Sequence, residues 1–228
     1  MARVWSIVVA GGSGLRFGQM KQFAQVSGHH VLHLAVEACR SVSSGVVLVV
    51  PAELSDSERR VVESCGADRV VSGGPTRARS VQCGLAAVPH DAEVILVHDA
   101  ARPLATRALF DAVLAAVTGD DVAGAVPGLR VHDTIKEVEI DEHGIARRVT
   151  TTLDRSKLVA VQTPQAFRAE ALRSAHRRLP ADEATDDASL VEAMGGTVVV
   201  VPGERGNLKL TTPDDLQAAE RVLEGRKG

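Results

Sequence analysis

The sequence predicts an α/β fold, in which helices cover both faces of a mostly parallel sheet. Short β-branched apolar runs alternate with longer stretches of helical periodicity along most of the chain. Near-continuous Val, Ile and Leu is typical of parallel strands that are buried on both faces. A regular alternation of such strands with amphipathic helices indicates a three-layer sandwich.

The strands are predicted from six apolar runs, at residues 5–10, 46–50, 69–71, 94–98, 122–126 and 197–201. Between them, stretches with helical periodicity predict helices at residues 32–40, 57–65, 77–87, 106–117 and 188–194. A last helix begins at Pro213, because Thr212 is a good capping residue and Asp214 and Asp215 suit the positive end of the helix dipole.

Residues 129–155 break this alternation and predict a protruding β-arm. Two alternating segments, 134–140 and 145–152, flank the turn sequence DEHG at 141–144. The ribbon is too highly charged for the main core, and a lone hairpin is marginal in water. We therefore expect a homodimer in which the arm packs on a second copy. No other boundary is visible, so residues 1–228 are predicted to form one domain.

Composition excludes several classes of protein. The 228 residues include 45% hydrophobic residues, which is enough for a buried core. A net charge of −3 and the absence of Tyr argue against nucleic-acid binding. The apolar run near the start is too short to cross a membrane. Cys39, Cys65 and Cys83 are scattered, which favours buried free thiols, and we expect a cytoplasmic protein without a membrane partner.

The segment VVAGGSGLRFGQMKQF at residues 8–23 favours binding of a polyphosphate. Its glycines let backbone N–H groups approach phosphate oxygens closely, and Arg16 and Lys21 add positive charge. The alternative is a flexible turn. A dinucleotide site is disfavoured because Phe17 replaces the third glycine, the helix is delayed to about His33 and the second strand ends without a carboxylate. The pattern suits a triphosphate.

Other candidate residues follow later strands. Asp99 comes directly after an apolar run and is a candidate Mg²⁺ ligand, or else a turn former. His98 is expected to pack or form hydrogen bonds. Arg77 and Arg79 follow near a helix N-terminus, where the dipole disfavours cations, which suggests an anion or a carboxylate partner; the alternative is an ordinary helix start. Lys209 alternates with two leucines and is expected to face the cleft, whereas Asp186 is expected to cap a helix, with metal binding as the second possibility.

Eight motifs in order carry a resemblance to a known family: AGGSGLRFG…KQF, SGGPTRARSV, VHDAARP, HDTIKEV, TLDR, TPQAF, ATDDAS and NLKLTTPDDL. The sequence resembles the 2-C-methyl-D-erythritol 4-phosphate cytidylyltransferases of the non-mevalonate isoprenoid pathway from Val4 to about Leu223. The resemblance implies a Rossmann-like nucleotidyltransferase fold that transfers CMP from CTP to 2-C-methyl-D-erythritol 4-phosphate. Met20 and Pro75 depart from the family, which usually has Pro and an acidic residue there.

The resemblance also implies a role for each matching position. Arg16 and Lys21 would hold the triphosphate and stabilise the transition state, and Asp99 would bind Mg²⁺. Arg155 and Lys209 would take part in catalysis by contacting the methylerythritol phosphate or the α-phosphate of CTP. The remaining positions would contact substrate: Ala10, Gly11, Gly12, Gly14, Gly74, Pro75, Ser80, Ala100, Arg102, Thr134, Thr163 and Thr185. The arm would lend Thr134 and Arg155 to the neighbouring subunit's site.

Two alternatives remain open at the level of sequence. A cytidylyltransferase for another polyol phosphate, such as ribitol 5-phosphate, would share the same frame. A non-catalytic nucleotide-binding module would be expected to have lost Arg16, Lys21 or Asp99, and all three are present. The reaction needs positioning and charge neutralisation, because a phosphate monoester is already an anion at neutral pH and requires no general base.

Overall fold

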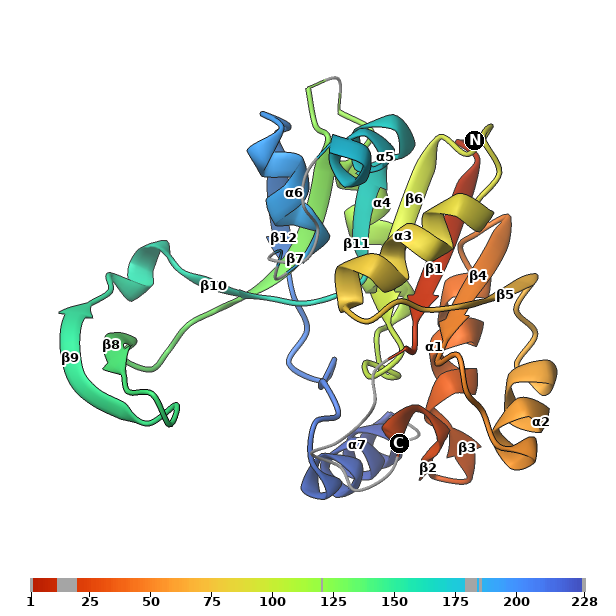
Figure 1. Ribbon diagram of the computed structural model, residues 1–228, viewed down its shortest axis with the longest axis horizontal. Coiled ribbons are helices and arrows are strands. Elements are labelled where there is room, and N and C mark those ends of the chain that lie inside the picture. Colours follow the sequence, from red (N-terminus) through yellow and green to blue (C-terminus); the bar gives the residue numbers. More distant parts are fainter. Residues whose placement is uncertain (1, 12–19, 120, 179–183, 185, 227–228) are drawn as a thin grey trace.

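The computed structural model describes residues 2–11, 20–119, 121–178, 184 and 186–226 of the chain. At its centre lies an eight-stranded sheet with the order β10-β7-β11-β6-β1-β4-β5, and β12 also pairs with β7 (Figure 1). The strands are β1 Val4–Val9, β4 Gly45–Val50, β5 Arg69–Ser72, β6 Val94–Asp99, β7 Gly124–Arg130, β10 Val159–Val161, β11 Gln165–Arg168 and β12 Val198–Pro202.

The sheet is mixed but mostly parallel, as the sequence predicts. Strand β1 pairs in parallel with β4 on one side and with β6 on the other, and β4 pairs in parallel with β5. Strand β11 runs antiparallel between β6 and β7. Strand order therefore reverses between β1 and β6, and ligands of open α/β sheets bind beyond the carboxyl ends of strands at such a point.

Helices cover both faces of the sheet because successive strand residues point to opposite sides. Val8 and Leu48 pack against α1, α2 and α4, whereas Ile7 and Val47 pack against α3, α5 and α6. Helix α7 covers a smaller apolar cluster around Leu210. The helices are α1 Val31–Arg40, α2 Asp56–Ser64, α3 Arg77–Ala87, α4 Arg107–Ala116, α5 Ala169–Arg178, α6 Asp187–Ala193 and α7 Pro213–Gly225.

The β-arm stands away from the body of the molecule (Figure 1). Strands β8 Lys136–Ile140 and β9 Ala146–Thr152 pair antiparallel, with Val138 opposite Val149. Their turn is closed by Asp141, whose side chain accepts from the backbone N–H of Ile145 at 2.9 Å, and by Gly144 at φ 77°. The predicted hairpin is therefore confirmed within one or two residues at each end.

Several elements differ from the sequence prediction. The predicted strand 122–126 is displaced, since β7 continues to Arg130; Leu129 and Arg130 belong to the sheet, paired with β10, and not to the arm. Strand β11 and helix α5 were missed, because the run 165–168 is short and α5 is rich in charge. The short hairpin β2 Gln25–Val26 and β3 His29–His30 was missed as well.

The three cysteines are free thiols, as predicted, with Cys39 and Cys65 buried and Cys83 half-buried. Burial raises the pKa of Cys39 to about 12, so this thiol is unreactive. Among the helices in the described ranges, none has both the length and the apolar character needed to cross a bilayer.

Gly84 sets how closely α3 packs on the sheet. A Cβ atom at this position would lie 2.6 Å from Ile7 Cγ2 and 3.1 Å from Val49 Cγ2. Gly84→Ala should therefore destabilise the protein by about 1–2 kcal/mol, because overpacking outweighs the gain in helix propensity. Urea unfolding measures this difference. A more stable variant would show that α3 and β1 have room for a methyl group.

Candidate active site

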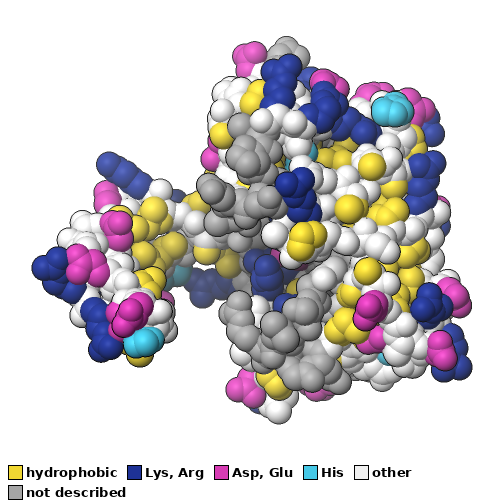
Figure 2. Space-filling view, viewed as in Figure 1, with side chains coloured by type: hydrophobic (Ala, Val, Ile, Leu, Met, Phe, Trp, Pro, Cys, Tyr) yellow, Lys and Arg dark blue, Asp and Glu magenta, His cyan; other side chains and the backbone are white. Residues whose placement is uncertain are grey.

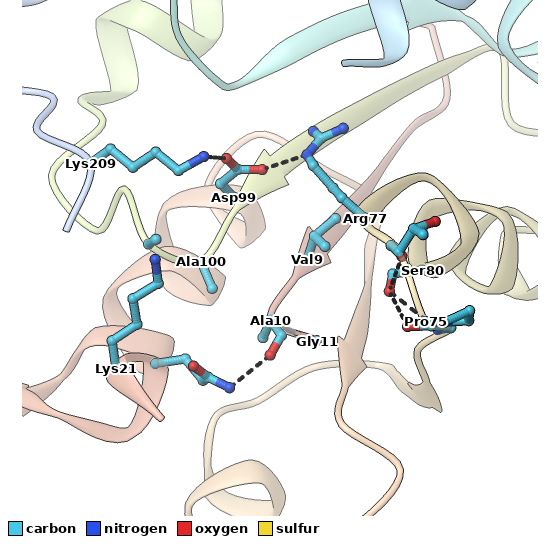
Figure 3. Close-up of a pocket in the computed structure, with 14 residues that line it drawn as sticks. Val9, Ala10, Gly11, Lys21, Pro75, Arg77, Ser80, Asp99, Ala100 and Lys209 are labelled. Carbon is cyan, nitrogen blue, oxygen red and sulfur yellow. Dashed lines mark hydrogen bonds and ion pairs between the residues drawn. The ribbon is translucent and has the colours of Figure 1, made fainter. Parts of the chain in front are cut away.

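A pocket of about 480 Å³ opens at the carboxyl ends of β1 and β6, where strand order reverses (Figure 3). The end of β1 contributes its floor, and the N-terminus of α3 and the turn after β6 form its walls. The lining residues are Val9, Ala10, Gly11, Lys21, Gln22, Gly74, Pro75, Thr76, Arg77, Ser80, Asp99, Ala100, Ala101 and Lys209.

Asp99 lines this pocket and is held by two cations. Arg77 Nε donates to its Oδ1 at 3.1 Å, and Lys209 Nζ donates to its Oδ2 at 2.8 Å (Figure 3). Burial alone would raise the pKa of Asp99, but the charges of Arg77 and Lys209 outweigh it and hold this pKa well below the usual range. The carboxylate is therefore ionised at neutral pH.

His98 and Thr163 fix the backbone next to Asp99. Thr163 Oγ1 accepts from the Asp99 backbone N–H at 3.0 Å and lies 3.2 Å from His98 Nδ1, while His98 Nε2 lies 3.1 Å from the Arg102 carbonyl oxygen. A carbonyl can only accept, so Nε2 carries the proton and Nδ1 accepts from Thr163. His98 is thus a hydrogen-bonding residue, as predicted.

The loops on the other side of the pocket are held by buried polar groups. Gln22 Nε2 donates to the Ala10 carbonyl oxygen at 2.9 Å, which ties the short 3₁₀ helix Lys21–Phe23 to the end of β1. Ser80 Oγ accepts from the Gly74 backbone N–H at 3.2 Å and donates to the Thr76 carbonyl at 3.0 Å. These bonds place Lys21 and the SGGPT turn on opposite walls of the pocket.

A second pocket of about 310 Å³ adjoins the first. The two pockets share Arg77, Asp99 and Lys209. The second is also lined by Arg102, Val161, Gln162, Thr163, Gln165 and Asp186. Two polar atoms of these residues, Arg102 Nε and Gln165 Oε1, are buried beneath the surface and have no hydrogen-bond partner among the described residues. The cations of the lining, Arg77, Arg102 and Lys209, favour an anionic ligand.

A register change between β10 and β11 creates the wall of this second pocket. Val161 pairs with Gly128 of β7, and Ala166 pairs with Ala125 of β7. The chain therefore advances by five residues from β10 to β11 while β7 advances by only three. The residues between the two strands, including Gln162 and Thr163, leave the regular ladder at the carboxyl end of β6, and Gln165 rejoins it opposite Val97. Sequence analysis identified Thr163 here through the family resemblance alone.

The structure brings most of the predicted site residues together. Nine line the first pocket: Ala10, Gly11, Lys21, Gly74, Pro75, Ser80, Asp99, Ala100 and Lys209. Arg102 and Thr163 line the second. Gly12, Gly14, Arg16 and Thr185 lie outside the described residues. Thr134 and Arg155 are exposed on the β-arm and line neither pocket.

The expected roles of Arg77 and Asp186 are confirmed, whereas Asp187 and Gln22 were missed as residues that organise the site. Arg77 was expected to need an anion or a carboxylate, and it binds two carboxylates, Asp99 and Asp187. Asp186 caps α6 by accepting from the Ser189 backbone N–H at 3.0 Å, as expected. Asp187 is fully buried, and only its place in the ATDDASL motif indicated that it could matter. Nothing in the sequence indicated a role for Gln22.

Asp99 also has the chemistry of a single Mg²⁺ ligand. Each of its oxygens accepts one hydrogen bond and keeps a second lone pair. Within the described ranges, no group of three or more His, Cys, Asp or Glu side chains could hold a metal by itself. The residues therefore fit an ion that is shared with substrate phosphates, as Mg²⁺ commonly is, and not a metal cage built by protein alone.

A mostly parallel sheet with helices on both faces and a cation-lined pocket at its switch point agrees with the α/β nucleotidyltransferase fold, which the solved structures below share. The chain belongs to the 2-C-methyl-D-erythritol 4-phosphate cytidylyltransferase family, whose sequence profile matches residues 4–225. The predicted resemblance and fold class are thereby confirmed.

Curated relatives support the same family. The chain is 42% identical to the bifunctional enzyme IspD/IspF of Anaeromyxobacter dehalogenans, over 97% of this chain and 57% of that protein. It is 40% identical to the 2-C-methyl-D-erythritol 4-phosphate cytidylyltransferase of Rubrobacter xylanophilus, over 100% of this chain and 97% of that protein. The chain thus spans little more than half the length of the bifunctional relatives.

Solved structures share the fold over nearly the whole chain. The 4-diphosphocytidyl-2C-methyl-D-erythritol synthase of Anaerococcus prevotii matches with a TM-score of 0.80 and 30% identity, over 98% of this chain and 99% of that one. The 2-C-methyl-D-erythritol 4-phosphate cytidylyltransferase of Thermus thermophilus matches with a TM-score of 0.74 and 33% identity, over 96% of this chain and 98% of that one.

The burial of His98 predicts a loss of stability in mild acid. Burial lowers the pKa of His98 from 6.5 to about 4, so the unfolded chain binds this proton more readily than the folded one. The stability that neutral His98 contributes is fully present above the pKa of His98 in the unfolded chain. It is lost as the pH falls toward the pKa of His98 in the folded protein. Between pH 7 and pH 5, the wild type should lose about 2 kcal/mol more than His98→Gln, measured by urea unfolding. Equal losses would contradict the pKa shift.

Proposed function

We propose that this protein transfers CMP from CTP to 2-C-methyl-D-erythritol 4-phosphate, releasing pyrophosphate and 4-diphosphocytidyl-2-C-methyl-D-erythritol for isoprenoid precursor synthesis. One observation carries the proposal. Two adjoining pockets share Arg77, Asp99 and Lys209, so a nucleotide in one and an acceptor in the other would meet at the same charged wall.

The charges of the pockets suit two anionic substrates. The described lining residues include four cations, Lys21, Arg77, Arg102 and Lys209, against two carboxylates, Asp99 and Asp186. In the proposed reaction an acceptor phosphate oxygen bonds to the α-phosphorus of CTP while the bond to the pyrophosphate oxygen breaks. Lys21 lies on the wall opposite Pro75, and we infer that it binds the triphosphate together with Arg16. Lys209 would position the acceptor phosphate.

The second pocket supports a polyol phosphate as acceptor. Arg102 offers a guanidinium for a phosphate group, and the polar side chains of Gln162 and Thr163 line the same pocket. We infer that Asp99 helps to hold Mg²⁺ with the nucleotide phosphates. When bound, the ion would neutralise charge on those phosphates, and Arg77 and Lys209 would keep the Asp99 carboxylate ionised and in place.

We further infer that the working unit is a homodimer joined through the β-arm in the cytoplasm. Apolar side chains of the arm are unusually exposed, with Ile140 at 64%, Ile145 at 51% and Val149 at 54%. Figure 2 shows hydrophobic side chains on the arm, bordered by charged ones. A second copy would bury this surface and would bring Thr134 and Arg155 to the partner's pocket.

Release of pyrophosphate tests the reaction. With CTP and Mg²⁺, the protein should act on 2-C-methyl-D-erythritol 4-phosphate and far less on ribitol 5-phosphate, and chelation of the metal should abolish turnover. Lys21→Ala and Arg16→Ala should each lower kcat at least about tenfold, since both cations would act on the charge that develops on pyrophosphate.

Two results would contradict these assignments. Preference for ribitol 5-phosphate would show that the acceptor is a different polyol phosphate. Nucleotide binding without turnover would favour a non-catalytic regulatory module. If either alanine variant raised only the KM for CTP, its cation would contribute to uniform binding and not to the transition state.

Mixing two inactive variants tests the shared site. Lys21→Ala and Arg155→Ala should each be inactive, because each damages one half of every composite site. In a mixed dimer one site carries both defects and the other carries neither, so equal mixing with free exchange should restore about a quarter of wild-type activity. Active monomers in sedimentation, or no recovery despite verified mixed dimers, would remove the shared site.

A further inference from the structure

A row of polar side chains, buried at its inner end, extends behind the pocket from Asp99 to helix α5. Arg77 uses two different nitrogens: Nε donates to Asp99, and Nη1 donates to Asp187 Oδ2 at 2.7 Å. The other oxygen of Asp187 lies 2.9 Å from His176 Nε2, which donates because a carboxylate oxygen only accepts. The row therefore reads Lys209, Asp99, Arg77, Asp187 and His176.

The inner members of this row do not touch substrate space. Asp187 and His176 are 0% and 5% exposed, and neither lines either of the two pockets. Arg77 is the link, since it lines both pockets. Within this row of side chains, Asp187 and His176 reach the pockets through the guanidinium of Arg77.

The geometry restricts Arg77 to one orientation. A guanidinium is planar, and two carboxylates that accept from different nitrogens fix both its position and its plane. Burial opposes ionisation of Asp187, but the charge of Arg77 and the hydrogen bond from His176 lower its pKa, so the carboxylate stays charged. An ion pair of this kind adds little net stability compared with apolar packing, which points to a role in specifying geometry.

We propose that Asp187 and His176 are positioning residues: they hold Arg77 where its Nε fixes Asp99 at the wall shared by the two pockets. This inference rests on the proposed cytidylyl transfer. Without His176, Asp187 can rotate and Arg77 loses one of its two anchors. Asp99 then keeps Lys209 but loses a fixed partner, so alignment of the reacting groups suffers more than binding of either substrate.

The helices themselves should keep their places when these side chains change. Gln82 Nε2 on α3 donates to the His176 carbonyl oxygen at 2.8 Å, a bond that does not involve the imidazole. Leu172 on α5 is fully buried in the apolar layer beneath. Variants of the imidazole therefore test its hydrogen bond to Asp187 separately from the packing of α5.

Steady-state kinetics of three variants measure the effect on the reaction. His176→Leu and Asp187→Asn should each lower kcat about tenfold, with KM for CTP changed less than about threefold. His176→Gln should keep most of the activity, because the Gln side-chain amide can donate from nearly the position of Nε2. Unchanged kcat in His176→Leu, or no recovery in His176→Gln, would overturn the proposal.

Two further variants in α5, the helix that carries His176, serve as controls. Leu172→Ala removes buried apolar volume without touching the row, and Glu170→Gln removes an exposed carboxylate that pairs with Arg177. Both should keep wild-type kcat well below the unfolding temperature, although Leu172→Ala should unfold at a lower temperature. If kcat fell as much in Leu172→Ala as in His176→Leu, loss of stability would explain the lower kcat of both variants. The positioning role of His176 would then be contradicted.

Hydrogen exchange at Arg77 can be measured without turnover, so it tests the positioning role independently of the proposed function. The Nε–Hε resonance of Arg77, assigned with Arg77→Lys, should exchange slowly with water in the wild type and in His176→Gln. It should exchange fast in His176→Leu and Asp187→Asn. An inactive wild type would contradict the proposed function, whereas equal exchange in all variants would contradict the role of His176 and Asp187 whatever the activity.

Discussion

The site depends on the placement of one buried carboxylate, Asp99, at the end of β6. A buried carboxylate is costly unless cations and hydrogen bonds compensate it. Arg77 from α3 and Lys209 from the segment before α7 supply the charges, and Thr163 Oγ1 fixes the Asp99 backbone N–H. Three segments distant in sequence must therefore converge on β6, and the pockets open between those segments.

The sheet topology explains why they converge there. Chain order reverses between β1 and β6, and the pocket opens at the carboxyl ends of these neighbouring strands. Helices α1 and α4, which follow the two strands, pack on one face of the sheet, and α3 packs on the other. The N-terminus of α3 then faces the pocket. A cation at a helix N-terminus is unfavourable, and Arg77 lies there because Asp99 and Asp187 together outweigh the helix dipole.

Much of the fold and part of the site could be predicted from sequence, for definite physical reasons. Strands such as β4 are apolar on both faces, and α3 was predicted with its observed bounds. Strand β11 was missed because only four residues mark it, and Asp187 because a Thr/Asp cluster reads equally as a helix cap. Contacts between distant segments, such as Arg77 with Asp187, leave no periodic trace, so only the structure reveals that pair.

The same contacts tie formation of the site to completion of the fold. Arg77 and Asp187 lie 110 positions apart, as do Asp99 and Lys209. Each pair closes only after α6 and the segment before α7 have packed against the first half of the sheet. Until then Asp99 lacks its compensating charges and remains hydrated, so the buried anion and the two pockets form together. An isolated first half of the chain would contain Arg77 and Asp99 but could not hold them in this arrangement.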